Sequence, residues 1–198
     1  MPVQRTSRGR SHLVAVVVAA LAALGTPLLA QQHVYKVLAT NKTSTMQKEM
    51  QEAGDAGFHF IAVMGGETAV GGKEVVVLMG KAPEDKATYS YRVLATNRTS
   101  TLQKELHDAA AGGFFVVGQT IFESMMGGKE SAAIAEKSSA DSSAVRYEYK
   151  LVATSKTSTL QKELQQVADE GFEAVRMTVG RTAVGGSELV VITRRVAK

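Results

Sequence analysis

The chain has 198 residues, no cysteine, and a formal net charge of +4 from 23 basic and 19 acidic residues. Three of the arginines lie in the first thirty residues, which hold no acidic residue, so 23 minus 3 leaves 20 basic residues against 19 acidic ones in the remainder. Disulfides, thiolate chemistry and cysteine zinc sites are therefore excluded. In the near-neutral remainder the basic residues cluster at the tail alone, at Arg194, Arg195 and Lys198, which argues against nucleic-acid binding.

Residues 1–30 have the pattern of an export signal. Arg5, Arg8 and Arg10 precede an apolar run at residues 13–24, and a small residue, Ala30, ends the segment. The run is shorter than the roughly 20 residues that a membrane-spanning helix needs. We therefore predict a signal peptide cleaved near Ala30, and a periplasmic or secreted protein. The alternative is an uncleaved segment that anchors the chain in the membrane.

One motif occurs three times, as TSTMQKEM at residues 43–50 and as TSTLQKEL at residues 99–106 and 157–164. Each copy is part of a longer segment in which the same residue types recur in the same order. These segments start about 56 to 58 residues apart. The sequence thus predicts three tandem repeats, at residues 33–81 (repeat 1), 89–137 (repeat 2) and 146–196 (repeat 3). The polar joins between them, rich in Ala and Ser, are typical of short flexible linkers.

Each repeat has the pattern of a strand, a helix and two further strands. Tyr35 and Val37 alternate with Lys36 and Leu38, and this period of two with aromatic and β-branched residues favours a strand. Met46, Met50 and Ala53 then follow at i, i+4 and i+7, which predicts one buried stripe on a helix. The corresponding positions in the other repeats are Leu102, Leu106 and Ala109, and Leu160, Leu164 and Val167. The fold class is therefore α+β, with three β-α-β-β repeats that each form a small three-stranded sheet with one helix on a face.

The helix ends carry local signals. Ser44 with Gln47 fits a capping box, in which the hydroxyl and the amide satisfy free backbone N–H groups at the helix start. The equivalent pairs are Ser100 with Gln103 and Ser158 with Gln161. At the other end, Gly57 followed by Phe58 predicts a left-handed residue with an apolar contact, as do the pairs at 113–114 and 171–172.

The last two strands of each repeat are predicted to form a hairpin at the Gly-Gly pairs 71–72, 127–128 and 185–186. Residues 75–78 and 189–192 are apolar on both strand faces, so we expect a neighbouring repeat or a second chain to cover the face opposite the helix. Residues 132–135 of repeat 2 are smaller, so this repeat is expected to be the most exposed. Whether the first strand pairs with the last or with the second is left open.

The opening Tyr-Lys-Val/Leu strand, the Leu-Gln-Lys-Glu-Leu helix ending in Gly-aromatic, and the apolar final strand resemble the small bacterial DUF4177 domains. The resemblance is carried in repeat 3 by residues 149–152, 160–164, 171–175 and 189–194. This chain has Gly-Phe where that family has Gly-Trp. The resemblance implies a compact strand–helix–strand–strand fold and implies no activity.

The residues that recur in the motif have structural roles, and they do not include a set of catalytic groups. No histidine lies at metal-ligand spacing from an acidic residue, and the serines and threonines of the motif are accounted for as helix caps. We therefore expect a non-enzymatic binding or assembly module of the cell envelope, without cofactor or metal, that meets a protein partner or itself through sheet faces or edges. A hydrolase is a third and weaker alternative.

A second hypothesis is recognition of a small anion or ligand at the three helix starts, where free N–H groups, a hydroxyl and a cation come together. The candidate residues are Lys42, Ser44, Arg98, Ser100, Lys156 and Ser158.

Overall fold

A computed structural model describes residues 32–68, 72–123, 129–142, 145–181 and 187–197. Within these residues there are three helices and nine strands, and the strands form three antiparallel sheets of three strands each. One helix packs against each sheet. The predicted α+β fold with three β-α-β-β repeats is confirmed. All of these elements belong to one compact unit, Gln31–Lys198, and the predicted signal peptide lies outside the described residues.

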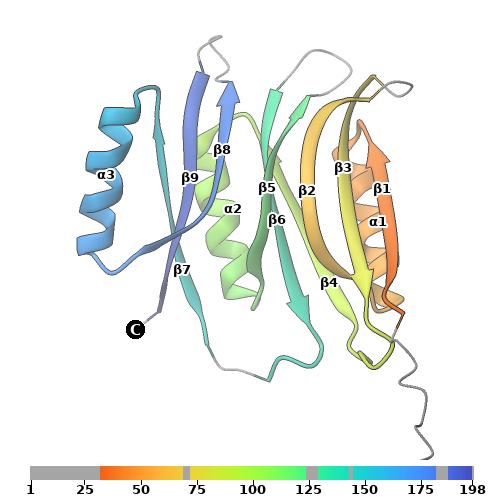
Figure 1. Cartoon of the computed structure of the whole chain (residues 1–198). Coiled ribbons are helices and arrows are strands. Elements are labelled where there is room, and N and C mark those ends of the chain that lie inside the picture. The colour runs from red at the N-terminus through yellow and green to blue at the C-terminus, as the bar shows by residue number, and fades with distance from the viewer. Residues whose placement is uncertain (1–31, 69–71, 124–128, 143–144, 182–186, 198) are drawn as a thin grey trace, which may run out of the picture. The chain divides into compact units, whose positions relative to one another are not determined.

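The three repeats have matching elements in the same order (Figure 1). Repeat 1 contains β1 (Val34–Thr40), α1 (Thr43–Asp55), β2 (His59–Thr68) and β3 (Gly72–Lys81). Repeat 2 contains β4 (Tyr89–Thr96), α2 (Thr99–Ala111), β5 (Phe115–Glu123) and β6 (Lys129–Ser138). Repeat 3 contains β7 (Tyr147–Thr154), α3 (Thr157–Asp169), β8 (Glu173–Arg181) and β9 (Ser187–Val196). The predicted Gly-Gly turns lie outside the described residues, except for Gly72 at the start of β3.

The strand order, which the sequence left open, is first–third–second in every sheet: β1-β3-β2, β4-β6-β5 and β7-β9-β8. The first strand therefore pairs with the last, in the same antiparallel register each time, as Val37 opposite Leu78 in repeat 1 illustrates. The equivalent pairs are Val93 with Ile134 and Leu151 with Ile192. In each described sheet the first strand thus forms an edge, and its outward N–H and C=O groups need another partner.

The helix starts differ from the sequence prediction. The helix of repeat 1 begins at Thr43 with Lys42 as its N-cap, and no side chain caps it. The same holds for Arg98 and Lys156, so the predicted capping boxes are wrong. The hydroxyl that helps the chain turn into the helix comes from the last strand residue instead, because Thr40 Oγ1 accepts a hydrogen bond from the Lys42 amide at 3.2 Å. Ser44 lies within the first turn and is exposed.

The helix ends are as predicted. Gly57, Gly113 and Gly171 have φ values of 86°, 80° and 87°, in the left-handed region that glycine adopts readily. The amide of the following phenylalanine then reaches back over the last turn, as in the 3.0 Å hydrogen bond from Phe58 N to Ala53 O. These bonds satisfy carbonyl groups that have no partner within the helix.

The hydrophobic cores join neighbouring repeats. The first core combines the buried stripe of α1, including Met46 and Met50, with Tyr91 and Ile134 of repeat 2. The second combines the stripe of α2 with Tyr149 and Ile192 of repeat 3. The third contains residues of repeat 3 alone and is smaller: Val152, Leu160, Val167 and Val191. Each of the first two helices therefore lies between its own sheet and the next, so the repeats are not independent domains.

Repeat 2 is the most buried repeat, so the prediction that it is the most exposed is wrong. The β6 residues 132–135 are at most 2% exposed and lie on both faces of the strand. Repeats 1 and 3 contact this repeat from its two sides, through β3 with β5 and β6 with β8. Small side chains in β6 thus reflect close packing between two neighbours, where larger ones would need more space.

We expect Gly171→Ala to lower the free energy of unfolding by about 1–2 kcal/mol, the cost of placing an L-residue in the left-handed region. No atom lies within 4 Å of the added Cβ, so the loss reports backbone conformation alone. Gly66→Ala is the matched control, because it also meets no atom within 4 Å and Gly66 has no positive φ. Urea denaturation should show little loss for the control; equal losses would contradict the assignment.

Candidate functional site

A glutamine side chain joins each of the first two helices to the next repeat. Gln47 on α1 donates from Nε2 to the Tyr91 carbonyl at 2.9 Å, and its Oε1 accepts from the Val93 amide at 2.7 Å. Gln103 on α2 makes the same pair with the Tyr149 carbonyl and the Leu151 amide, at 2.7 and 2.8 Å. The side-chain amide thus takes the place of a neighbouring strand on the open edge of β4 or β7. We call this two-bond contact the glutamine clasp.

A tyrosine from the next repeat adds a second contact. The Tyr149 hydroxyl accepts a hydrogen bond of 2.8 Å from the Val116 amide at the β-bulge of β5. In the first interface Glu136 lies between the two groups, since its Oε2 accepts from the Tyr91 hydroxyl at 2.6 Å and from the Phe60 amide at 2.9 Å. Burial, together with the hydrogen bond to Glu136, raises the pKa of Tyr91 above its usual range. Burial also raises the pKa of Tyr149, so both hydroxyls remain neutral in the core.

The repeats approach so closely that side chains are excluded at some positions. A Cβ atom at Gly54 would lie 2.1 Å from the Tyr89 carbonyl oxygen, and one at Gly118 would lie 2.6 Å from the Phe60 ring. Alternate residues of β5 face different neighbours, because Gly118 packs on repeat 1 whereas Gln119 donates to the Val190 carbonyl of repeat 3 at 3.4 Å. The second strand of a repeat therefore contributes to two different interfaces.

Some residues of repeat 1 are exposed although their counterparts in repeats 2 and 3 pack against the preceding repeat. Tyr35 and Val37 on β1 are 62% and 63% exposed, whereas the equivalent Tyr91 and Tyr149 are 3% and 2% exposed. On β2, the exposed Ala62 and Met64 occupy the alternate positions that face away from repeat 2, and Met64 is 67% exposed. We call Tyr35, Val37, Ala62 and Met64 the first-repeat surface.

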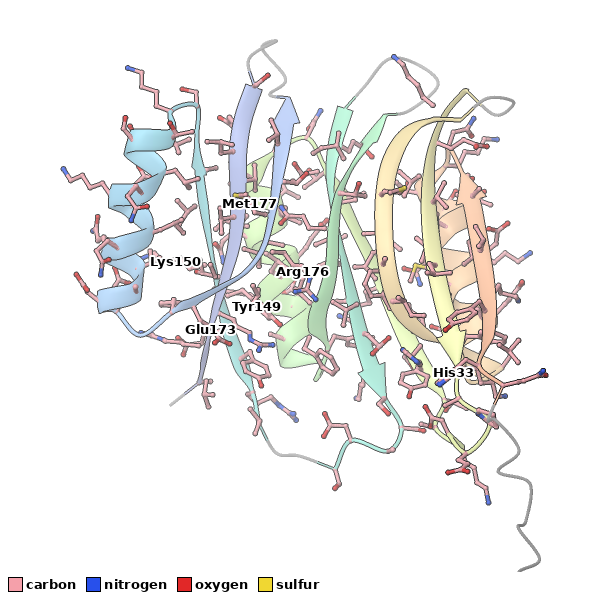
Figure 2. All side chains as sticks on the ribbon, viewed as in Figure 1. His33, Tyr149, Lys150, Glu173, Arg176 and Met177 are labelled. Atoms are coloured by element: carbon pink, nitrogen blue, oxygen red, sulfur yellow. The ribbon has the colours of Figure 1, made fainter. Side chains whose placement is uncertain are left out.

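Repeat 3 presents the complementary residues. Met177 and Val179 on β8 are 64% and 59% exposed, while Gln119, the counterpart of Met177 in β5, is buried. Figure 2 shows Arg176 directed toward β5, where its Nε donates to the Val117 carbonyl at 2.8 Å, and Met177 on the other side of the strand. On α3, Gln161 and Ala168 are exposed. We call Gln161, Ala168, Met177 and Val179 the third-repeat surface.

The six residues predicted at the helix starts, Lys42, Ser44, Arg98, Ser100, Lys156 and Ser158, are all exposed. Within the described residues, their side chains make no hydrogen bond or ion pair. Ser100 borders a groove of ≈ 500 Å³ between α2, β7 and α3, which Gln103 and Glu163 also line. Recognition of a small ligand at these positions stays a prediction.

A second cavity, of ≈ 430 Å³, lies where the join after β6 passes repeats 2 and 3. Lys137, Arg146 and Arg194 line it. Two of these cations already have partners, because Lys137 Nζ donates to the Gly112 carbonyl at 3.0 Å and Arg194 Nε to Glu173 at 2.8 Å. Asp141 and Ser142 also line the cavity, so it holds a carboxylate and a hydroxyl beside the three cations.

Among the described residues, no group of three or more His, Asp or Glu side chains is placed to hold a metal ion. His107 takes the place of Gln51 in its repeat and contacts the Tyr149 carbonyl at 3.0 Å, which is a structural role. In the same part of the chain, no helix is long and apolar enough to span a membrane.

Sequence reasoning missed the glutamine clasp, because a capping box and a long-range amide contact have the same local pattern. The available signal was the identical Gln in all three repeats at a position that faces the following sheet. The tyrosines of the first strands also differ in burial: Tyr91 and Tyr149 are buried, Tyr147 is partly buried and Tyr35 is exposed. Comparisons with family models, with curated proteins and with solved structures each found no match for this chain.

We expect Gln103→Ala to lower the free energy of unfolding by about 1–3 kcal/mol, because it leaves the Leu151 amide without its partner and the Tyr149 carbonyl with His107 alone. Gln161→Ala is the matched control in the same motif, with no partner to lose within the described residues, and should stay within about 0.5 kcal/mol of the wild type. Urea denaturation of the monomer measures both. Similar losses for the two variants would contradict the clasp.

Glu105 on α2 provides a pH test. Its Oε2 atom is buried without a hydrogen-bond partner in the described chain, and burial, with the nearby Asp108, raises the pKa of its carboxyl group. The folded state therefore binds this proton more tightly than the unfolded state, so the charged form destabilises the fold above the raised pKa. We expect Glu105→Gln to raise the melting temperature near pH 7.

That gain should shrink as the pH falls through the raised pKa, where Glu105 itself becomes neutral. Thermal unfolding at several pH values tests this, with Glu49→Gln at the equivalent position of α1 as the control. A gain for Glu105→Gln that does not change with pH would show that the buried charge is not its cause.

Proposed function

We propose that this chain is an exported, non-enzymatic assembly module that binds protein partners through its two end surfaces. The observation that supports this is the exposure of apolar residues at the first-repeat and third-repeat surfaces, at positions that the other repeats use for packing. Tyr35 is 62% exposed where its counterparts are at most 3% exposed, and Met177 is 64% exposed. Exposed apolar patches of this kind mark interaction sites on soluble proteins.

The edge of β1 supports the same proposal. In repeats 2 and 3 the equivalent edge is occupied by a glutamine clasp, whereas β1 has only β3 as its neighbour in the described sheet. An open edge with an apolar face is suited to binding a segment or a side chain that pairs with the backbone. The relation to DUF4177 domains and the placement in the periplasm or outside the cell belong to this proposal as well.

The experiment is site-specific photocrosslinking in cells that make the full chain. A photoreactive amino acid is placed at Met64 or at Met177, one on each end surface, and Lys162 serves as an exposed control on the outer side of α3. We expect covalent adducts from Met64 and Met177 and few from Lys162. Mass spectrometry then identifies the partner.

Two results would contradict the proposal: end positions that give no adduct, or adducts as frequent from Lys162 as from Met64 and Met177. Localisation is tested in the same cells by fractionation and by mass measurement of the N-terminus. A cytosolic chain that retains Met1 would contradict export.

A further inference from the structure

Resting on the proposed assembly function, we propose that the partner is a second copy of this chain, docked head to tail. The third-repeat surface of one copy, on α3 and β8, packs on the first-repeat surface of the next copy, on β1 and β2. The new interface would repeat the contact that the chain already makes twice, between repeats 1 and 2 and between repeats 2 and 3.

The first argument is the glutamine clasp. Gln47 and Gln103 each bridge a carbonyl and an amide two residues apart on the next first strand. Gln161 has the same place in α3, is exposed, and makes no hydrogen bond within the described chain. The matching backbone groups in repeat 1 are the Tyr35 carbonyl and the Val37 amide. They lie on the outer side of β1, because the register of β1 with β3 equals that of β4 with β6.

The second argument is burial. The apolar stripe of the helix is fully buried in α1 and α2, where Met50 and Leu106 are 0% exposed. The equivalent Leu164 of α3 is only partly buried. Ala168 is exposed, whereas its counterparts Gly54 and Ala110 are buried against β4 and in the second core. The third core is thus missing the sheet that a following repeat would supply, and β1 with its own sheet has the matching face.

The third argument is chemical complementarity at the second strands. In the first interface, Val63 and Gly65 meet Gly118 and Thr120. In the proposed interface, Met177 and Val179 would meet Ala62 and Met64, so that apolar side chains face apolar side chains. The Tyr35 hydroxyl would reach the exposed Ala174 at the β8 bulge, as the Tyr149 hydroxyl reaches the Val116 amide.

Because the two surfaces are different, the contact is heterologous. Each added copy again presents one surface of each kind, so assembly continues into an open filament unless the rotation between copies closes a ring.

The test uses the unit Gln31–Lys198 and two blocked variants. Tyr35→Lys with Met64→Lys blocks the first-repeat surface, and Gln161→Ala with Met177→Lys blocks the third-repeat surface. All four positions are exposed, so the fold should be retained, which circular dichroism verifies. Lys162→Ala is the matched control, because Lys162 and its counterparts Lys48 and Lys104 are all exposed.

Sedimentation equilibrium should give a wild-type average mass that rises with concentration, and the same for Lys162→Ala. Each blocked variant alone should stay at the monomer mass. An equimolar mixture of the two should reach twice the monomer mass and stop there, because one intact surface of each kind remains. An isologous interface would not be restored by mixing.

A wild type that remains monomeric up to its solubility limit, blocked variants that assemble as the wild type does, or a mixture that stays monomeric would each overturn head-to-tail docking. The crosslinking experiment separates this from failure of the proposed function. Adducts from Met177 to a different protein, with a monomeric wild type, would leave the assembly role standing and remove the second copy as partner.

Discussion

The arrangement of this protein depends on one constraint: the first strand of each sheet has an open edge, and for β4 and β7 the helix of the preceding repeat closes it. A glutamine amide is suited to this role because it carries a donor and an acceptor with the spacing of a peptide group. Gln47 and Gln103 fill it with bonds of 2.7 to 2.9 Å. The same contact fixes the order of the repeats, since a helix that clasps the next strand also buries its apolar stripe against the next sheet.

This constraint explains why identical motifs have different environments. The sequences around Tyr35, Tyr91 and Tyr149 are nearly the same, yet the first tyrosine is exposed and the other two are buried. The difference lies in what precedes each strand, because a helix stands before β4 and β7 in the array, and the described chain has none before β1. Position in the array, more than local sequence, decides whether a residue belongs to a core or to a surface.

Features controlled by neighbouring residues were predictable from the sequence. The left-handed glycines at 57, 113 and 171 were identified because a helix end with a following phenylalanine is a local pattern. The helix stripe and the β-α-β-β order follow from periodicities of 3.6 and 2 residues. Strand order was left open, since both pairings satisfy the same alternation. The role of Gln47 and the burial of β6 depend on which distant element lies opposite these side chains, and a sequence alone does not report this.

Near-identical repeats in one chain risk docking on the wrong neighbour during folding. The close approach between β2 and β5 discourages this error. Gly118 leaves room for Phe60 and Val63, and the same place in repeat 3 holds Arg176. If repeat 3 took the place of repeat 2 beside repeat 1, this guanidinium would lie where Gly118 leaves room for Phe60 and Val63. Gly118 and Arg176 thus distinguish repeat 2 from repeat 3 at one equivalent position. The repeats can therefore remain similar elsewhere and still pack in a fixed order.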